Sequence, residues 1–335
     1  MLLGILTAGC REEPQAPPQA HGIIISTHGV GEDWGTPGMV SAMEAVRAVG
    51  ANWVSIHPYA SIGNDGSVRT ILDQPASPDS LPDYLAVPLK ASRDLGLQLQ
   101  IKPHLAYWGS RFSWRGEITF TTEAEWARFF EQYQAWIVGL ARGTQHADAF
   151  VVGTELDLTL HREAEWRRII AAVREVTDLP LTYAANWTHY AEVPFWDALD
   201  QVGIQAYFPV CDSTAVTPEL LDAGWNRILE SLRAYSASTG KHIVFTELGY
   251  NRAHDTAATP WAYHTHGHEA EAVQAMCLAA ALRAVQNEPF LDGVFLWKWF
   301  PNPRPVGRNF QLATPALQAV ITQAWASSPA PAPVP

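Results

Sequence analysis

Two glutamates stand at corresponding places in the sequence, each at or near the end of a hydrophobic run. Glu155 ends the run 149–155 and Glu247 ends the run 242–247, and each lies in a Thr-Glu-Leu triplet. Apolar runs of this length, bounded by polar residues, are typical of buried parallel strands, so each carboxylate is expected at a strand tip. Two carboxylates that converge from different strand tips suit the hydrolysis of a glycosidic bond, which needs an acid and a nucleophile.

Eight hydrophobic runs alternate with amphipathic stretches and are predicted to be strands. They are residues 22–26, 53–59, 97–104, 150–155, 181–186, 202–207, 243–247 and 294–299. Helical spacing of apolar residues marks the stretches between them, as in Trp126, Phe130 and Ile137. Each alternation implies a right-handed crossover onto a parallel sheet. The pattern therefore predicts an α/β fold, a (β/α)8 TIM barrel, with its site at the C-terminal ends of the strands.

An open doubly wound sheet is the competing architecture. Its nucleotide-binding forms have a glycine-rich turn after an early strand. Residues 26–34 here read Ser-Thr-His-Gly-Val-Gly-Glu-Asp-Trp, which contains neither GxGxxG nor a P-loop lysine. The barrel is therefore favoured.

Composition is consistent with one large domain. The chain has 335 residues, of which 47% are hydrophobic and 17% charged, so a second core is not required. Its net charge of −12 argues against nucleic acid or an anionic membrane surface as a partner, because both require a basic footprint. Several of the 14 Trp and 10 Tyr residues fall at strand ends or in loops, where they could stack on sugar rings.

The N-terminal segment resembles the remnant of a bacterial lipoprotein signal. Residues 1–10 are apolar and end in small residues and Cys10, the expected lipidation site, although no positive region precedes them. Residues 11–20 are rich in Pro, Gln and Ala and predict a flexible tether, ahead of a barrel domain over 21–326. A Pro/Ala-rich tail over 327–335 is expected to be disordered. These features indicate a lipoprotein of the bacterial cell envelope; a disordered cytosolic tail is the alternative.

Cysteine and histidine spacing does not indicate a zinc site. Cys211 and Cys277 could pair, but Cys277 lies in a helical apolar stripe, which favours a buried thiol. The loop after the seventh expected strand holds His254, Asp255, Trp261, His264, His266 and His268. A metal site there is one interpretation, and a cleft-lining loop is the favoured one, so no metal or cofactor is expected.

Six motifs, taken in order and register, resemble glycoside hydrolase family 113. They are 34–37 (Trp-Gly-Thr-Pro), 53–56 (Trp-Val-Ser-Ile), 101–104 (Ile-Lys-Pro-His), 152–155 (Val-Gly-Thr-Glu), 245–250 (Phe-Thr-Glu-Leu-Gly-Tyr) and 297–299 (Trp-Lys-Trp). The resemblance spans about residues 22–326. It implies a retaining (β/α)8 glycosidase, best described as an endo-β-1,4-mannanase acting on mannan or glucomannan. It also implies that Glu155 is the acid/base and Glu247 the nucleophile.

Further site residues are expected at the strand tips. By resemblance, Tyr207 donates to the nucleophile. Trp297 ends the eighth expected strand and is the expected sugar platform, because an aromatic face matches the C–H face of a pyranose. The candidates for substrate binding are His57, Lys102, His104, Asn186 and Trp187. They are chosen only by their position near strand ends and by the alternation of side chains along a strand. Two departures from the wider clan stand out: Thr154 occupies the place of an asparagine that usually precedes the acid/base, and the second strand ends without the familiar arginine.

Two other functions remain open from the sequence. The same carboxylates could cleave another β-glycan, cellulosic or from a cell wall, because the motifs do not name the sugar. A noncatalytic carbohydrate-binding lipoprotein is also possible, although pure binding gains nothing from a close pair of like charges. In each case the expected partner is a polysaccharide or oligosaccharide, and the chain is expected to be a monomer.

Overall fold

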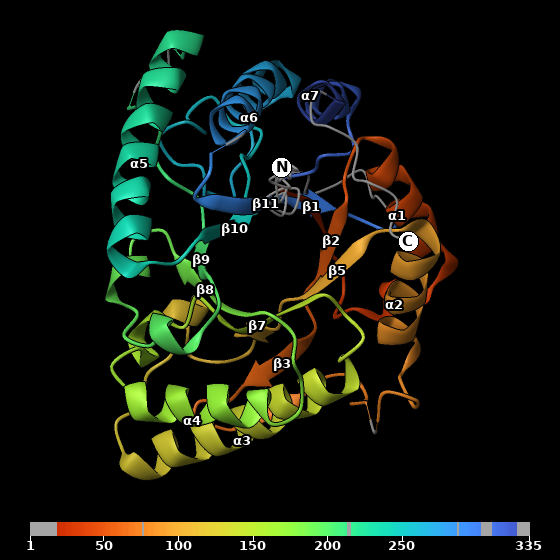
Figure 1. Ribbon diagram of the computed structural model, residues 1–335, viewed down its shortest axis with the longest axis vertical. Coiled ribbons are helices and arrows are strands. Elements are labelled where there is room, and N and C mark those ends of the chain that lie inside the picture. The colour runs from red at the N-terminus through yellow and green to blue at the C-terminus, as the bar shows by residue number, and fades with distance from the viewer. Residues whose placement is uncertain (1–18, 76, 213–215, 287, 303–309, 327–335) are drawn as a thin grey trace, which may run out of the picture.

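Eight parallel strands close a barrel in the computed structural model, which describes residues 19–75, 77–212, 216–286, 288–302 and 310–326 (Figure 1). The strands are β1 (Ala20–Ile25), β2 (Trp53–Ile56), β5 (Gln98–Ile101), β7 (Ala149–Thr154), β8 (Leu181–Asn186), β9 (Val202–Gln205), β10 (Ile243–Leu248) and β11 (Leu291–Trp299). Around the barrel they follow the order β1-β11-β10-β9-β8-β7-β5-β2, and β2 pairs with β1 to close it. All eight expected strands are present, and the predicted (β/α)8 fold is confirmed.

Seven α-helices surround the barrel within the described ranges (Figure 1). They are α1 (Pro37–Ala48), α2 (Asp83–Leu95), α3 (Glu123–Gly143), α4 (Glu163–Arg174), α5 (Pro218–Thr239), α6 (Glu271–Val285) and α7 (Pro315–Ala326). Local sequence explains their starts: Thr122 and Glu125 form a capping box at α3, and Thr217 caps α5 ahead of Pro218.

One expected helical stretch is absent between β8 and β9. Two short 3-10 helices, η4 (Tyr190–Glu192) and η5 (Trp196–Ala198), make that connection instead. Pro194 lies between them, and proline cannot continue a helix because it lacks the backbone N–H. The expectation of eight helical repeats is wrong at this position.

The second and third predicted strands are each divided. β2 ends at Ile56 and β5 at Ile101, because Pro58 and Pro103 interrupt the ladder. Beyond these breaks the chain forms a separate three-stranded sheet from β3 (Tyr59–Ile62), β4 (Val68–Thr70) and β6 (His104–Ala106). β3 and β6 of this sheet follow β2 and β5 in the chain, and they carry the cleft residues Tyr59 and His104.

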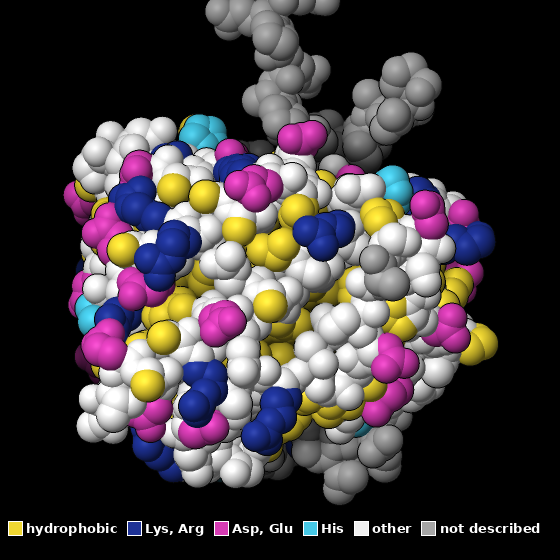
Figure 2. Space-filling model, turned by 90° about the horizontal axis from the view of Figure 1, so that it is seen from below, with side chains coloured by type: hydrophobic (Ala, Val, Ile, Leu, Met, Phe, Trp, Pro, Cys, Tyr) yellow, Lys and Arg dark blue, Asp and Glu magenta, His cyan; other side chains and the backbone are white. Residues whose placement is uncertain are grey.

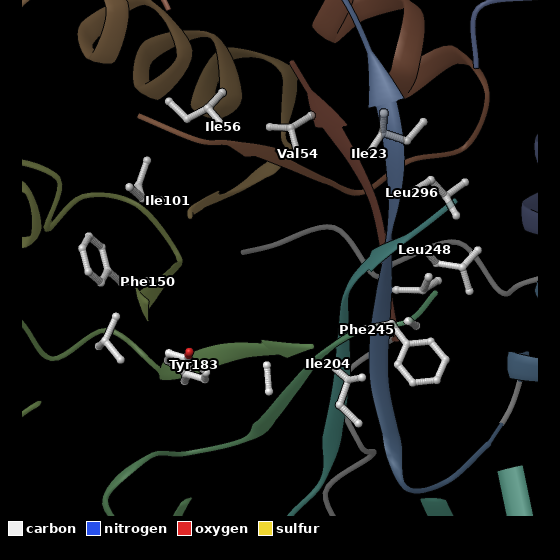
Figure 3. Packing of buried hydrophobic residues seen from close by; sticks show 14 of the residues in the cluster. Ile23, Val54, Ile56, Ile101, Phe150, Tyr183, Ile204, Phe245, Leu248 and Leu296 are labelled. Carbon is white, nitrogen blue, oxygen red and sulfur yellow. The ribbon is translucent and has the colours of Figure 1, made fainter. Parts of the chain in front are cut away.

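Two clusters of apolar side chains hold the barrel together. The larger cluster contains strand residues such as Ile23, Val54 and Phe245 (Figure 3) together with residues of the helices, such as Met43 of α1. A smaller cluster comprises Ile24, Tyr207, Val244, Phe295, Trp297 and Phe310. Residues Ile23 and Ile24 belong to different clusters, as expected for strand side chains that alternate between the two faces. Burial of each large apolar side chain contributes about 1.5–3 kcal/mol.

The ordered barrel begins slightly earlier than the sequence indicated. The side chain of Gln19 donates to Val285 O and Leu291 O, and Ala20 starts β1, so neither belongs to a free tether. Residues 1–10 with Cys10, most of the 11–20 segment and the 327–335 tail lie outside the described residues. None of the described helices is long and apolar enough to cross a bilayer.

Cys211 and Cys277 are thiols and do not form a disulfide. Burial raises the pKa of Cys277 to about 12. The structure therefore agrees with the buried thiol that the sequence favoured.

Basic and acidic side chains are interspersed on the face seen from the side of α3 and α4 (Figure 2). Ion pairs involving residues of α3 and α4 join opposite charges: Arg162 contacts Glu123 at 2.7 Å, and Arg167 contacts Asp197 at 2.8 Å. A mixed surface of this kind differs from the basic stripe of nucleic-acid-binding proteins.

Candidate active site

A cleft of about 970 Å³ lies beyond the C-terminal ends of the barrel strands, and both glutamates line it. Glu155 directly follows β7, and Glu247 is the last residue but one of β10. The other lining residues come mainly from the loops after the strands, and they include Tyr59, His104, Trp108, Arg115, Asn186, Trp187, Tyr207, Trp261, Tyr263, Trp297 and Lys298. The predicted convergence of the two carboxylates in one cleft is therefore found.

Glu247 is only 4% exposed and is held by two donors. Lys102 Nζ donates to Oε1, and the Tyr207 hydroxyl donates to Oε2 at 2.6 Å. His104 Nε2 lies 3.7 Å from Oε1. These contacts fix the orientation of the carboxylate and stabilise its negative charge.

Lys102 is fully buried behind Glu247 and does not line the cleft. Burial lowers the pKa of Lys102, and the adjacent Glu247 carboxylate opposes that shift. An unpaired ammonium at this depth would be costly, so the lysine and the glutamate depend on each other.

Glu155 has an unusual backbone, with φ of 51°, in the left-handed region that non-glycine residues rarely adopt. Its N–H donates to Ala184 O at 2.9 Å, and the next N–H, of Leu156, donates to the Tyr183 hydroxyl at 2.7 Å. Such strain persists only where surrounding contacts over-determine the conformation. Here these contacts fix a turn at the point where the side chain enters the cleft.

The electrostatics of Glu155 differ from those of Glu247. Burial raises the pKa of Glu155 to about 7, Arg115 acts to lower it, and the charge of Glu247 acts to raise it. Arg115 Nη1 lies 3.4 Å from Glu155 Oε2. Below pH 7 Glu155 is thus mostly a carboxylic acid, the form that a general acid requires, and it shares the cleft with the carboxyl group that Lys102 and Tyr207 hold.

Trp297 and His104 line the cleft as expected, whereas His57 lies behind its wall. His57 is fully buried, and its ring stacks on His104 at 4.7 Å and lies 5.4 Å from Trp297. The side chain therefore lies behind these two residues and not in the cleft, where the sequence had placed it. Thr154 is also internal, since its hydroxyl donates to Pro103 O at 3.0 Å.

Asn186 ends β8, Trp187 follows it, and both line the cleft. The Asn186 side chain accepts from the N–H and the hydroxyl of Thr188 and closes a tight turn. Trp187 stacks on Trp261 of the loop after β10, with ring centroids 5.4 Å apart.

The histidine-rich loop after β10 is tied down by internal contacts. Asn251 Nδ2 donates to His264 O at 2.6 Å, His264 Nε2 contacts Asp255 Oδ1 at 2.8 Å, and the His254 N–H donates to Nδ1 of His266 at 2.9 Å. Asp255, His264 and His266 bring potential ligand atoms within 4.8 Å of one another, although both histidines are exposed. Trp261 and Tyr263 of this loop line the cleft, which agrees with the favoured interpretation of the segment.

Several cleft residues were not identified as site residues from the sequence, among them Tyr59, Trp108, Arg115 and Tyr263. Trp108 is 54% exposed and Tyr263 70% exposed, which is unusual for large aromatic side chains outside a binding surface. Trp108 sits in a Gly- and Ser-containing loop, a signal that could have identified it. Arg115 carries no comparable local signal.

Comparison with known proteins places the chain in a family. The model for Glycoside Hydrolase Family 113 matches residues 25–306. No curated protein matches the sequence significantly. Two structures described as GH113 mannanases share the fold. One, the β-mannanase AaManA from Alicyclobacillus acidocaldarius in complex with ManMIm, is 24% identical, with 93% of this chain and 98% of that chain covered and a TM-score of 0.77.

The second, a complex of a GH113 β-1,4-mannanase, is 21% identical, with 92% and 99% of the two chains covered and a TM-score of 0.77. A Ruminococcus gnavus β-glucuronidase is more distant, at 14% identity, 92% and 50% coverage and a TM-score of 0.62. The aligned region covers nearly the whole length of each mannanase, and the family model matches most of this chain. The chain therefore belongs to glycoside hydrolase family 113.

Proposed function

We propose that this glycoside hydrolase cleaves β-1,4-mannan or glucomannan with retention of configuration, using Glu247 as the nucleophile and Glu155 as the acid/base. The observation that carries the proposal is the asymmetric pair in one cleft: Glu247 is hydrogen-bonded to Lys102 and Tyr207, and Glu155 is a largely buried carboxyl group with a raised pKa. Family membership and the mannanase names of the similar structures support the choice of substrate.

The reaction then proceeds in two balanced steps. In the first, a Glu247 oxygen bonds to the anomeric carbon, the glycosidic C–O bond breaks, and Glu155 gives its proton to the departing oxygen. In the second, Glu155 takes a proton from water, the water oxygen bonds to the anomeric carbon, and Glu247 is released as the carboxylate. A retaining mechanism of this kind requires the two carboxyl groups about 5 Å apart.

Aromatic side chains on opposite sides of the barrel support a polymeric substrate. Trp108 follows β6, which continues from β5, and Trp261 follows β10. β5 and β10 are four strands apart in the eight-strand order, so the strands that precede the two tryptophans lie on opposite sides of the barrel, and both side chains line the cleft. A glycan that contacts both would need several sugar units, which favours a polymer as the substrate.

The direct test is release of reducing ends from mannan, glucomannan, cellulose, xylan and peptidoglycan. We expect activity on the first two, with a ladder of oligosaccharide products from internal cleavage. Activity confined to cellulose or to peptidoglycan would reject the mannan assignment and retain the two-carboxylate chemistry.

The alkaline limb of activity should report Glu155. Its pKa is raised to about 7 by burial, and the first step needs its protonated form. For mannan-type substrates kcat/KM should therefore fall about tenfold for each pH unit above that value. A dinitrophenyl glycoside, whose leaving group needs no proton, serves as the control and should lack this limb. If kcat/KM for the polymer stays constant well above pH 7, Glu155 is not the general acid.

Removing an aromatic platform should weaken action on the polymer selectively. Trp261→Ala and Trp108→Ala are each expected to lower kcat/KM on mannan by about tenfold, equivalent to about 1.4 kcal/mol. Activity on a short aryl glycoside should change little. Leu220→Ala is the control, because Leu220 is also an exposed hydrophobic residue but lies on α5 outside the cleft. Equal losses on both substrates would contradict a binding role.

We further propose that Cys10 is acylated and that the protein acts as a monomer anchored at the bacterial cell envelope. The proposal rests on the apolar 1–10 segment and the Pro- and Gln-rich residues that follow it. Mass spectrometry of the native protein should find a processed chain that begins at a lipid-modified cysteine. Full-length, unmodified protein recovered from the cytosol would reject the anchor, and a dimer in size-exclusion chromatography would reject the monomer.

A further inference from the structure

Arg115 approaches the candidate acid/base from a loop that belongs to neither glutamate's strand. It begins η2 (Arg115–Glu117), between β6 and α3, and its Nη1 lies 3.4 Å from Glu155 Oε2. The two side chains are only 13% and 12% exposed. Because little water screens this pair, the interaction is stronger than that of a surface ion pair.

The loop holds Arg115 in a defined place. The Glu117 carboxylate accepts from the N–H and the hydroxyl of Ser113, at 3.1 and 2.8 Å. Gly116 packs beneath the Trp114 ring, which a Cβ at that position would approach to 2.0 Å. η2 also packs against η3 (Asp157–Thr159), the turn that follows Glu155. The backbones that carry the arginine and the glutamate are thus fixed relative to each other.

We propose that Arg115 is a positioning residue that holds the ionised form of Glu155 in place to accept a proton from water in the second step. The proposal rests on the double displacement described above. Arg115 Nε is buried without a hydrogen-bond partner among the described residues, and the hydrogen bond to Glu155 is the one that the guanidinium makes there. Guanidinium groups bind carboxylates with several directed donors, which gives geometry as well as charge.

Burial and several charges act on the pKa of Glu155, and Arg115 is one of them. Burial raises the pKa of Glu155, Arg115 exerts the largest opposing effect, and Glu247, Asp157 and Lys102 contribute less. Tyr183, Tyr207 and Tyr263 also face this carboxyl group. Burial acts to lower the pKa of Arg115, but neighbouring groups, Glu155 first among them, raise it overall. Without the arginine, the neutral acid would persist to higher pH.

This effect matters unequally in the two steps. The first step needs the acid form, which burial already supplies, whereas the second needs the base. In the glycosyl-enzyme Glu247 is esterified and carries no charge, so Arg115 and Lys102 are the remaining charges that favour the ionised base. Loss of Arg115 should therefore slow deglycosylation more than glycosylation.

The test compares Arg115→Met, Arg115→Lys and the wild type on a dinitrophenyl β-mannoside oligosaccharide. In Arg115→Met the initial burst of dinitrophenol should remain within about threefold of wild type, while the steady-state rate near pH 6 falls about tenfold for each unit by which the Glu155 pKa rises. The alkaline limb of kcat/KM on mannan should move to higher pH. Arg115→Lys should restore most of both quantities.

Arg111→Met is the matched control, since Arg111 lies in the same loop, is exposed, and does not line the cleft. If the burst and the steady-state rate fall by the same factor and the alkaline limb of kcat/KM stays at the same pH, the proposal is overturned in favour of a structural role. A raised KM with unchanged limbs would overturn it in favour of substrate binding. Failure of the double displacement itself looks different, because the wild type would then show no burst.

Discussion

Glu247→Ala is expected to abolish formation of the glycosyl-enzyme and to reduce kcat/KM by about 10⁵-fold or more. Glu247 is the carboxylate that Lys102 and Tyr207 hold in the cleft, and a methyl group offers no atom to bond to the anomeric carbon. The measurement is a rapid-mixing assay with a dinitrophenyl glycoside, in which the wild type should give a burst and the variant none. Mass spectrometry of the reacted protein should find the covalent sugar on the wild type alone.

A loss of folding must be separated from this loss of chemistry. Removal of Glu247 leaves Lys102 buried without its carboxylate, and breaking a buried ion pair costs about 3–5 kcal/mol. Release of the lysine proton would reduce that penalty, since burial already lowers the pKa of Lys102. Glu247→Gln keeps the shape and a hydrogen-bond acceptor, so it should fold better than the alanine variant while remaining inactive. A burst from either variant would show that another group is the nucleophile.

The positions of the two glutamates were predictable because strand pattern and strand end are local properties. The runs before Glu155 and Glu247 are apolar on both faces, and in a barrel all such strands deliver their last residues to one rim. The order of the motifs then fixed which strand each belongs to. Tyr207 was expected from the family resemblance and Trp297 from its place at the end of the eighth predicted strand, and both lie in the cleft.

Other features depend on contacts between segments far apart in the sequence. Arg115 reaches Glu155 from a loop 40 residues away, and no periodicity marks a loop. The alternation of side chains along a strand predicted that His57 and Lys102 line the cleft. However, Pro58 and Pro103 interrupt the two strands there, and the side chains of His57 and Lys102 lie behind the catalytic surface. The small sheet formed by β3, β4 and β6 went unrecognised for the same reason, because apolar runs continued across the two prolines.

Glu155→Ala should separate the two steps, and azide should restore the second. With a dinitrophenyl leaving group the first step needs no acid, so the variant should still form the glycosyl-enzyme and give a burst. The steady-state rate should then fall about 10²–10⁴-fold, the contribution usual for a positioned acid or base. Azide is a nucleophile that needs no base, and the space left by the Glu155 side chain lies within the cleft.

Added azide should therefore accelerate turnover and yield a β-glycosyl azide, because it attacks the face opposite Glu247. Glu131→Ala, a change at an exposed glutamate on α3, should show neither the loss nor the rescue. An α-configured azide from Glu155→Ala would mean that the two roles are reversed. Normal oligosaccharide binding with no azide effect in either glutamate variant would instead favour a carbohydrate-binding protein, for which neither the strained backbone of Glu155 nor the buried Lys102–Glu247 pair would have a chemical purpose.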